Sequence, residues 1–499
     1  MNARLLQPLA ALVAGALLSF AFAPWEWWPL ALLCPAVLVW LWEGAAPRRA
    51  ALLGFCFNTG TFAVGTWWLY VSIHGFGQAP VWLALVLMAG LVAIMGAYHA
   101  LLGWAIARWL PRSGALRWLL GIPAAWLLIE WLRGWFLSGF AWLSLGYSQT
   151  GSILAALAPL GGTYLLSWLL LLGAGALVTL LRGTPRERVL AAAALLLPWA
   201  IAWPLRGVEW TTPTGPAVEV AIVQGAIPQD QKWLDANRDT TLDLYHELTR
   251  GVLGVPVIVW PESAAPDLAN NIVPYLAAVG REAGARGSTL VMGLVRAEGR
   301  DAQGEPLYFN SVLAYGGTVA WYDKHFLVPF AEFFPVPSFV RRWLRLMSLP
   351  YSDFTRGALV QPPLPAGPLR LAATVCYEDA YGSSQLPALA SATALVNVTN
   401  DAWFGRSSAR YQHLQISRMR AIEAQRYLIR AANDGVTALI GPRGELLARA
   451  TEYRAEVLRG AVVPRSGRPP YARVGNYPIV ALCALLLALA VLARRRDGA

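Results

Sequence analysis

The chain has 499 residues and a formal net charge of +11; 57% of its residues are hydrophobic and only 14% are charged. Its mean hydropathy is +0.46. A soluble domain carries roughly a quarter of charged residues, so this composition indicates a membrane protein. The basic residues are spread over short loops between apolar runs and form no single basic face, which excludes nucleic acid as the expected partner.

Apolar runs that could cross a bilayer, which takes about 17 to 25 helical residues, dominate the first 205 positions and return at the end. They lie at residues 5–23, 29–42, 50–70, 81–107, 116–135, 164–181, 189–204 and 474–493, of which the second and seventh are short. Arginines gather in every second connection, whereas residues 24–28, 72–80 and 137–162 contain neither Lys nor Arg. The positive-inside rule therefore predicts eight transmembrane helices, with both termini in the cytoplasm and residues 205–473 outside it.

From residue 217 the pattern changes to short strands and amphipathic helices. The predicted strands lie at residues 218–223, 256–260, 289–296, 310–315, 319–322, 371–375, 394–397 and 437–440. Helices are expected at 236–253 and 272–286, between the strands that end at 375 and begin at 394, and at 412–432. Because strand and helix alternate, we predict one mixed-sheet α/β domain of about 260 residues.

Three polar residues stand at or just beyond the ends of these strands: Glu262, Lys324 and Cys376. Strand ends on one edge of an α/β sheet converge on one crevice, so residues far apart in sequence can meet there. A thiol that attacks an acyl carbon needs a base to take its proton and donors to hold the developing oxyanion. Glu262 would be the base, and Lys324 with the backbone N–H near Tyr377 would be the donors.

Each of these three residues also has a structural interpretation. Glu262 could cap the following helix, Lys324 could be a surface ammonium, and a free cysteine is usually a small core residue. Two observations favour the chemical interpretation. Cys376 is the only cysteine outside the apolar runs, and Lys232 and Lys324 are the only lysines among 40 basic residues. A lysine kept in so arginine-rich a chain suggests a position that needs a compact ammonium.

Several motifs resemble those of a known family. Trp260-Pro-Glu-Ser, Tyr322-Asp-Lys-His with the stretch to Pro335, and Cys376-Tyr-Glu are similar to the Glu-Lys-Cys motifs of the nitrilase superfamily. With seven apolar runs before the domain and one after it, the chain resembles the apolipoprotein N-acyltransferase family of Gram-negative bacteria over nearly its whole length. Further similar stretches are residues 223–228, Lys232 with Trp233, 399–405 and 412–436.

The resemblance implies an eight-helix membrane protein with an inserted nitrilase-like αββα sandwich. Residues 1–205 would form a seven-helix transmembrane domain, 206–473 the catalytic domain, and 474–499 the last helix with a basic cytoplasmic tail. It also implies a bacterial inner-membrane location with the catalytic domain in the periplasm. Neither a metal nor another cofactor is expected, and the sequence has no His-Glu-x-x-His run and no Gly-rich phosphate loop with lysine.

The implied reaction is a two-step acyl transfer. A phospholipid, expected to be phosphatidylethanolamine, would donate its sn-1 acyl chain to Cys376 as a thioester. The α-amino group of an S-diacylglyceryl cysteine, at the N-terminus of an apolipoprotein, would then take the chain.

The resemblance also assigns roles to single positions. It makes Glu262 the base, Lys324 the oxyanion-stabilising lysine, and Glu332 and Glu378 the carboxylates that orient the lysine and the cysteine. Trp233 and Tyr377 correspond to substrate-contacting aromatic residues.

Residues 333–349 interleave aromatic and aliphatic residues with arginines, a pattern typical of a segment at a membrane interface. We therefore predict a mobile lid over Cys376 in which Phe339 and Trp343 contact substrate. A packed surface helix is the alternative.

Two other functions remain open from the sequence. A membrane-anchored amidase of the nitrilase type would use the same triad with water as the acceptor. A transporter with an outer binding domain would not need Cys376. Eight helices favour lipid substrates over a simple anchor, and charged residues are scarce at mid-membrane, which counts against transport.

Overall fold

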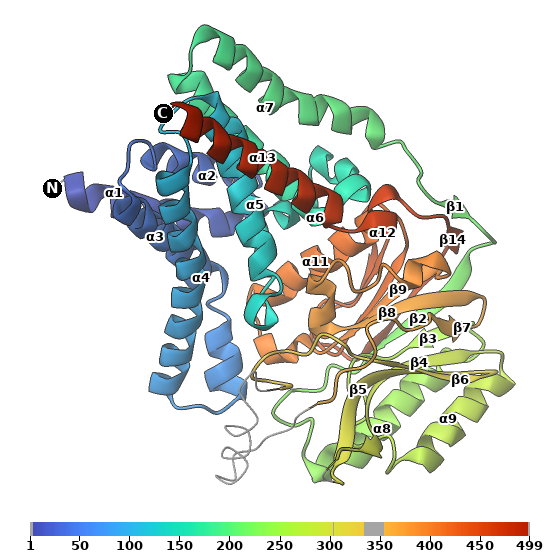
Figure 1. The fold of residues 1–499 in the computed structure, drawn as a ribbon. Coiled ribbons are helices and arrows are strands. Elements are labelled where there is room, and N and C mark those ends of the chain that lie inside the picture. Colours follow the sequence, from blue (N-terminus) through green and yellow to red (C-terminus); the bar gives the residue numbers. More distant parts are fainter. Residues whose placement is uncertain (1–2, 303, 334–353, 498–499) are drawn as a thin grey trace. The chain divides into compact units, whose positions relative to one another are not determined.

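The computed structural model describes residues 3–302, 304–333 and 354–497 (Figure 1). It divides into two compact units. The first comprises Met1–Val208, Arg406–Gln415 and Pro470–Ala499, and the second comprises Glu209–Gly405 and Ile416–Pro469. Each unit is described by itself.

The first unit is helical, and each of the eight apolar runs contains a helix. The helices are α1 (Ala3–Leu18), α2 (Leu30–Leu41), α3 (Pro47–Gly65), α4 (Val81–Trp109), α5 (Ile122–Arg133), α6 (Ala158–Arg182), α7 (Pro185–Leu205), the short α12 (Pro470–Val474) and α13 (Tyr477–Asp497). Local signals explain why α7 begins where it does. Thr184 and Glu187 form a capping box around Pro185, which satisfies the first N–H groups of the helix.

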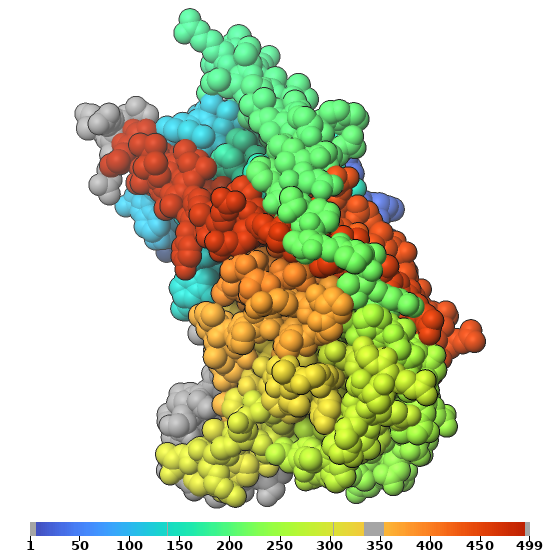
Figure 2. Space-filling view, turned by 90° about the vertical axis from the view of Figure 1, so that its right-hand side faces the viewer, coloured from blue at the N-terminus to red at the C-terminus, as the bar shows by residue number. Residues whose placement is uncertain are grey.

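Among the described residues, four helical stretches are long and apolar enough to cross a membrane. They are Val81–Trp109, Ile153–Arg182, Pro185–Leu205 and Tyr477–Arg494; Leu6–Ala21 and Leu30–Leu41 are apolar but shorter. Figure 2 shows α7 in green and α13 in red on the surface, and both helices carry exposed leucines such as Leu196 and Leu485. The helices therefore support a membrane protein, while the number of eight spans stays a prediction.

The second unit contains two six-stranded sheets. Its strands are β1 (Thr212–Pro213), β2 (Val218–Gln224), β3 (Val257–Val259), β4 (Thr289–Arg300), β5 (Pro306–Tyr315), β6 (Val319–Asp323), β7 (Leu364–Ala366), β8 (Leu369–Val375), β9 (Ala394–Thr399), β10 (Leu428–Ala432), β11 (Ala438–Ile440), β12 (Leu446–Arg449), β13 (Glu456–Val462) and β14 (Arg465–Ser466). One sheet has the order β13-β2-β3-β4-β5-β6, the other has the order β12-β11-β10-β9-β8-β7, and β1 pairs with β14.

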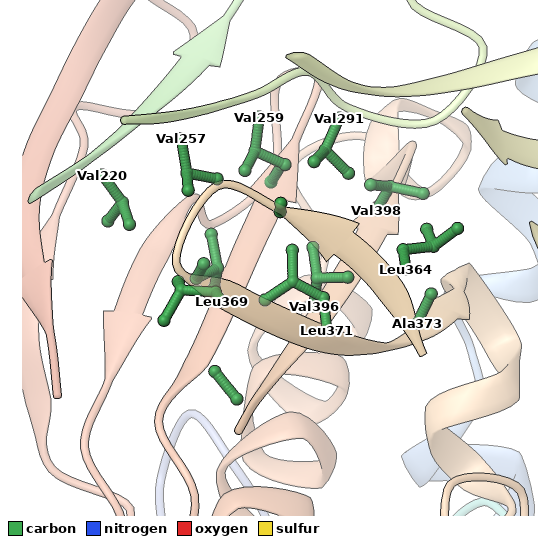
Figure 3. Packing of buried hydrophobic residues seen from close by; sticks show 14 of the residues in the cluster. Val220, Val257, Val259, Val291, Leu364, Leu369, Leu371, Ala373, Val396 and Val398 are labelled. Atoms are coloured by element: carbon green, nitrogen blue, oxygen red, sulfur yellow. The ribbon is translucent and has the colours of Figure 1, made fainter. Parts of the chain in front are cut away.

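The two sheets pack face to face. Val220, Val257, Val259 and Val291 of one sheet meet Leu364, Leu369, Leu371, Ala373, Val396 and Val398 of the other in a buried apolar cluster (Figure 3). Strand residues alternate between faces, so Ile258 and Leu290 point the other way. There they pack with residues of α8 (Asp235–Arg250) and α9 (Val273–Ala285).

A helix also covers the outer face of the second sheet. Ser417, in the part of α11 (Ala409–Ala424) that belongs to this unit, contacts Arg430 of β10. The order of layers is therefore helix, sheet, sheet, helix, which confirms the α/β sandwich that the resemblance implies. The single mixed sheet predicted from the alternation of elements is wrong, because the strands divide between two six-stranded sheets.

Two elements predicted from the sequence are wrong. No α-helix joins β8 to β9; the connection has only the short 3₁₀ turns Cys376–Ala380 (η7) and Ala388–Ala390 (η8), because Gly382 and Pro387 interrupt any longer helix. The helix predicted to run to residue 432 ends at Ala424, and Gln425 follows it with a φ of 45°. The next residues form β10, a fully buried strand parallel to β9, so sheet pairing outweighs their helical propensity.

Candidate active site

Cys376 lies at a strained turn between a strand and a 3₁₀ helix. The preceding strand β8 ends at Val375, whose side chain points into the core between the sheets. Cys376 then takes a φ of 51°, begins η7 and is partly buried. A left-handed conformation costs a non-glycine residue about 1–2 kcal/mol, and such strain is typical of functional sites. This strained position holds the one cysteine in the sequence of the second unit.

Glu262 follows β3 and is held from two sides. Its Oε1 accepts a hydrogen bond from Asn310 Nδ2 at 2.8 Å, and its Oε2 accepts one from the backbone N–H of Asn400 at 2.9 Å. The side chain is buried. These hydrogen bonds fix the orientation of the Glu262 carboxylate. A general base needs a fixed orientation, because it must lie within hydrogen-bond distance of the proton that it accepts.

Lys324, just after β6, is placed between two carboxylates. Its Nζ lies 2.8 Å from Glu332 Oε2, 2.9 Å from Glu332 Oε1 and 4.0 Å from Glu262 Oε1. Asn310 Nδ2 also donates to Glu332 Oε1 at 2.8 Å, so one amide joins the two acids. Burial alone would lower the pKa of Lys324, but the charges of Glu332 and Glu262 outweigh it and raise the pKa. Lys324 is therefore a permanent cation at neutral pH.

Glu378 ties the segment of Lys324 to the segment of Cys376. Its carboxylate accepts hydrogen bonds from the N–H groups of His325 and Phe326, at 2.8 and 3.0 Å, and from the Tyr322 hydroxyl at 3.0 Å. It also accepts one from the N–H of Val375 at 2.9 Å. Burial raises the pKa of Glu378 to about 7. The two motifs are thus linked through a single carboxylate.

The surroundings of Cys376 favour the neutral thiol. Burial raises its pKa, the negative charge of Glu262 raises it further, and the positive charge of Lys324 opposes both. A thiol in this state does not ionise spontaneously at neutral pH, so it needs a base during attack. Glu262 has the fixed orientation for that task, and its role as the base stays a prediction.

The predicted site residues fall into three groups. Contacts join Glu262, Lys324 and Glu332 directly, and Glu378 links Lys324's segment with that of Cys376. Tyr377 is buried with its ring 5.4 Å from that of Tyr381, whereas Trp233 is 49% exposed. Phe339 and Trp343 of the proposed lid lie outside the described residues. The substrate contacts of these aromatic residues, and the expected absence of a metal, stay predictions.

The sequence interpretation missed three asparagines that contact the site residues, and it gave Lys232 no role among them. Asn310 bridges the two acids, and the backbone of Asn400 holds Glu262. Asn397 donates to the carbonyl of Cys376, and Lys232 Nζ donates to the carbonyl of Glu262 at 3.2 Å. For Lys232 a signal existed, because it is one of the two lysines in the sequence, and both are fully buried beside Glu262. An asparagine inside a short apolar strand gives a much weaker signal.

Lys232 makes the stability of the protein depend on pH. Burial lowers its pKa from 10.5 to about 8. Between those values the unfolded chain binds more protons at this position than the folded one, so the free energy of unfolding rises with pH. We expect the wild-type protein to gain stability relative to Lys232→Met as the pH increases from 8 to 10, measured by unfolding in detergent. A constant difference over that range would contradict the assigned burial of the charge.

Comparison with known proteins identifies the family. Residues 14–176 match the family model described as apolipoprotein N-acyltransferase N-terminal domain, and residues 219–468 match that of carbon-nitrogen hydrolase. An apolipoprotein N-acyltransferase from Azotobacter vinelandii is 43% identical over 98% of this chain and 96% of its own. The chain belongs to the apolipoprotein N-acyltransferase family.

Other apolipoprotein N-acyltransferases are nearly as similar. The one from Pseudomonas putida is 42% identical over 98% of this chain and 97% of its own. Among solved structures, a carbon-nitrogen hydrolase from Helicobacter pylori aligns with a TM-score of 0.37 and 19% identity, over 50% of this chain and 89% of that one. Membership of the apolipoprotein N-acyltransferase family makes the chain an acyltransferase with a carbon-nitrogen hydrolase domain.

Proposed function

We propose that the chain transfers an acyl chain from a phospholipid, through a thioester on Cys376, to the α-amino group of an S-diacylglyceryl cysteine at the N-terminus of an apolipoprotein. The observation that carries the proposal is the placement of Lys324 between the buried carboxylates Glu262 and Glu332, with its charge and that of Glu262 acting on Cys376. This arrangement supplies a base, a cation and a nucleophile, which is what acyl transfer through a thiol requires.

In the first step Glu262 takes the thiol proton as Cys376 Sγ attacks the ester carbonyl of the phospholipid. The carbonyl oxygen becomes negative and is stabilised by Lys324 and the N–H of Tyr377. The carbon–oxygen bond of the ester then breaks. The leaving alkoxide takes the proton from Glu262 and departs as lysophospholipid, and the acyl chain remains on Cys376 as a thioester.

In the second step the neutral α-amino group of the acceptor attacks the thioester carbonyl. The same donors hold the oxyanion, and Glu262 accepts a proton from the attacking amine. The carbon–sulfur bond breaks as the amide forms, and the thiolate of Cys376 recovers the proton from Glu262. Glu332 keeps Lys324 protonated and in place through both steps, because the ion pair favours the charged form of the lysine.

The proposal includes a topology. Eight helices would cross the bacterial inner membrane with both termini in the cytoplasm, and residues 206–473 would lie in the periplasm. The apolar helices and the arginine-free alternate loops support it. Phosphatidylethanolamine in the outer leaflet would then be the donor nearest to the site.

One experiment separates this function from its alternatives. Purified protein in lipid vesicles is incubated with phosphatidylethanolamine labelled in its sn-1 chain and with a synthetic diacylated lipopeptide, and Cys376→Ala serves as control. We expect a labelled thioester on the wild-type protein without the peptide, and N-acylated peptide when it is added. Release of labelled fatty acid alone would indicate a hydrolase and refute the transferase. If wild type and Cys376→Ala both leave the label on the phospholipid, the proposal fails entirely.

A further inference from the structure

A row of polar residues crosses the outer face of the second sheet behind Cys376. Thr374 of β8 pairs in register with Asn397 of β9, and Asn397 pairs with Arg430 of β10. Their strand neighbours on the inner face, such as Val396 and Ile429, are apolar core residues. All three polar side chains are fully buried, where apolar residues would cost less free energy. Their position next to the nucleophile suggests why they are polar.

Asn397 lies at the centre of this row and has a single possible orientation. Its Oδ1 accepts a hydrogen bond from Arg430 at 2.8 Å, and its Nδ2 donates to Thr374 Oγ1 at 3.0 Å and to the backbone carbonyl of Cys376 at 3.3 Å. Because a guanidinium can only donate, the amide oxygen must face Arg430. The amide nitrogen is therefore directed at the carbonyl of Cys376.

Arg430 is itself immobilised. Its guanidinium lies 2.8 Å from Asp401 Oδ2, donates to Ser417 Oγ at 2.7 Å and is 3.8 Å from Asp379 Oδ2. Arg430, Asp379 and Asp401 are buried, so the charges compensate one another in a region of low dielectric constant. Asn397 is thus hydrogen-bonded to an immobilised guanidinium, which keeps its Nδ2 close to the backbone carbonyl of Cys376.

The carbonyl of Cys376 and the N–H of Tyr377 belong to one peptide group. A trans peptide is planar, and its C=O and N–H point in opposite directions. By holding the carbonyl towards the sheet, Asn397 therefore directs the Tyr377 N–H to the opposite side of that plane. The same hydrogen bond also stabilises the left-handed conformation of Cys376, which is otherwise unfavourable.

The geometry points to Asn397, held by Arg430, as a positioning residue that aims the N–H of Tyr377 at the oxyanion of the acyl transfer. This inference rests on the proposed function, in which that N–H is one of two oxyanion donors. Neither residue touches substrate. Their effect passes through one peptide plane, and it should appear in both half-reactions because both form an oxyanion.

The most informative variant is Asn397→Asp. It keeps the size of the side chain and still offers an oxygen to Arg430, but it has no donor for the carbonyl of Cys376. We expect thioester formation from labelled phosphatidylethanolamine to fall about 10²-fold in kcat with little change in KM, since the loss of one oxyanion donor has that size. The matched control is Asn270→Asp, the same change at an exposed asparagine whose Nδ2 donates to the backbone carbonyl of Ala297 at 2.9 Å and which belongs to no part of this network. We expect it to acylate at the wild-type rate.

A second readout separates positioning from structural damage. Alkylation of Cys376 by iodoacetamide displaces iodide from a saturated carbon and develops no oxyanion. We therefore expect Cys376 to be alkylated in Asn397→Asp at a rate within about twofold of that of the wild type. The rate is measured by mass spectrometry of the peptide that contains Cys376. Equal losses of alkylation and acylation would show a misplaced thiol and overturn the inference.

The two proposals fail in different ways. If the wild-type protein forms no thioester, the proposed function is refuted and this inference falls with it. If wild type and Asn397→Asp form the thioester at the same rate, only the inference fails. Should Asn397→Asp not fold, Asn397→Ala gives the same test, because it also removes the donor to the carbonyl of Cys376.

Discussion

Replacing Cys376 with serine is expected to abolish acyl transfer and leave the fold intact. The hydroxyl occupies nearly the same volume as the thiol, and serine meets the same backbone cost at a φ of 51°. The chemistry changes far more, because a hydroxyl holds its proton much more strongly than a thiol and is a much weaker nucleophile. We expect the rate to fall by at least about 10³-fold, while complete removal of a nucleophile from its catalytic unit costs about 10⁶-fold in kcat.

The measurement is the amount of labelled acyl-enzyme and of N-acylated lipopeptide, together with the unfolding midpoint in detergent. Cys56→Ser is the matched control, because Cys56 is also partly buried but belongs to helix α3 of the first unit. It should retain activity. A fully active Cys376→Ser protein would mean that another group is the nucleophile.

Replacing Lys324 with methionine is expected to reduce both activity and stability. Its ammonium compensates the buried carboxylates Glu332 and Glu262, at 2.8 and 4.0 Å. Without it those charges stay buried with only amide and N–H donors, which costs about 3–5 kcal/mol of folding free energy. Loss of the cation from the oxyanion site should also reduce acyl transfer by about 10²- to 10³-fold.

A double variant separates the two effects. In Lys324→Met combined with Glu332→Gln, the closer of the two carboxylates loses its charge as well and only Glu262 is left without this cation, so part of the lost stability should return while acyl transfer stays low. Unfolding in detergent and thioester formation are measured side by side for both variants. A double variant that recovers activity along with stability would show that Lys324 acts only through the fold. If the single variant is as stable as the wild type, the assigned burial of this ion pair is wrong.

Much of the fold could be predicted because its pattern is local. The apolar runs predicted helices within about six residues of their observed bounds. Alternation predicted a strand at 218–223, where β2 is Val218–Gln224, and a short apolar run predicted one at 371–375, where β8 is Leu369–Val375. The wrong assignment at β10 has a clear cause. Leu-Ile-Arg-Ala-Ala suits a helix by propensity, and its buried parallel pairing with β9 depends on residues about 30 positions earlier.

The candidate site was partly predictable for a similar reason. Glu262, Lys324 and Cys376 could be proposed because reactive residue types stand at strand ends. Asn310 and Asn397 could not, because their role depends on which acceptors lie across the sheet, and a single asparagine in a strand does not reveal them. Both asparagines orient other groups through hydrogen bonds, and their partners can be identified only when the register of the strands is known.

The burial of both lysines has a consequence for the protein's own integrity. An enzyme that makes amides from a reactive thioester could acylate its own side-chain amines. Here the sequence contains only Lys232 and Lys324, and their exposed fractions are 0% and 1%. In the proposed mechanism the thioester would form near Lys324, where Glu332 favours the protonated lysine, and an ammonium has no lone pair with which to attack. The ion pair that we propose prepares Lys324 for an oxyanion would then also protect the acyl-enzyme from self-modification and leave the acyl chain for the acceptor.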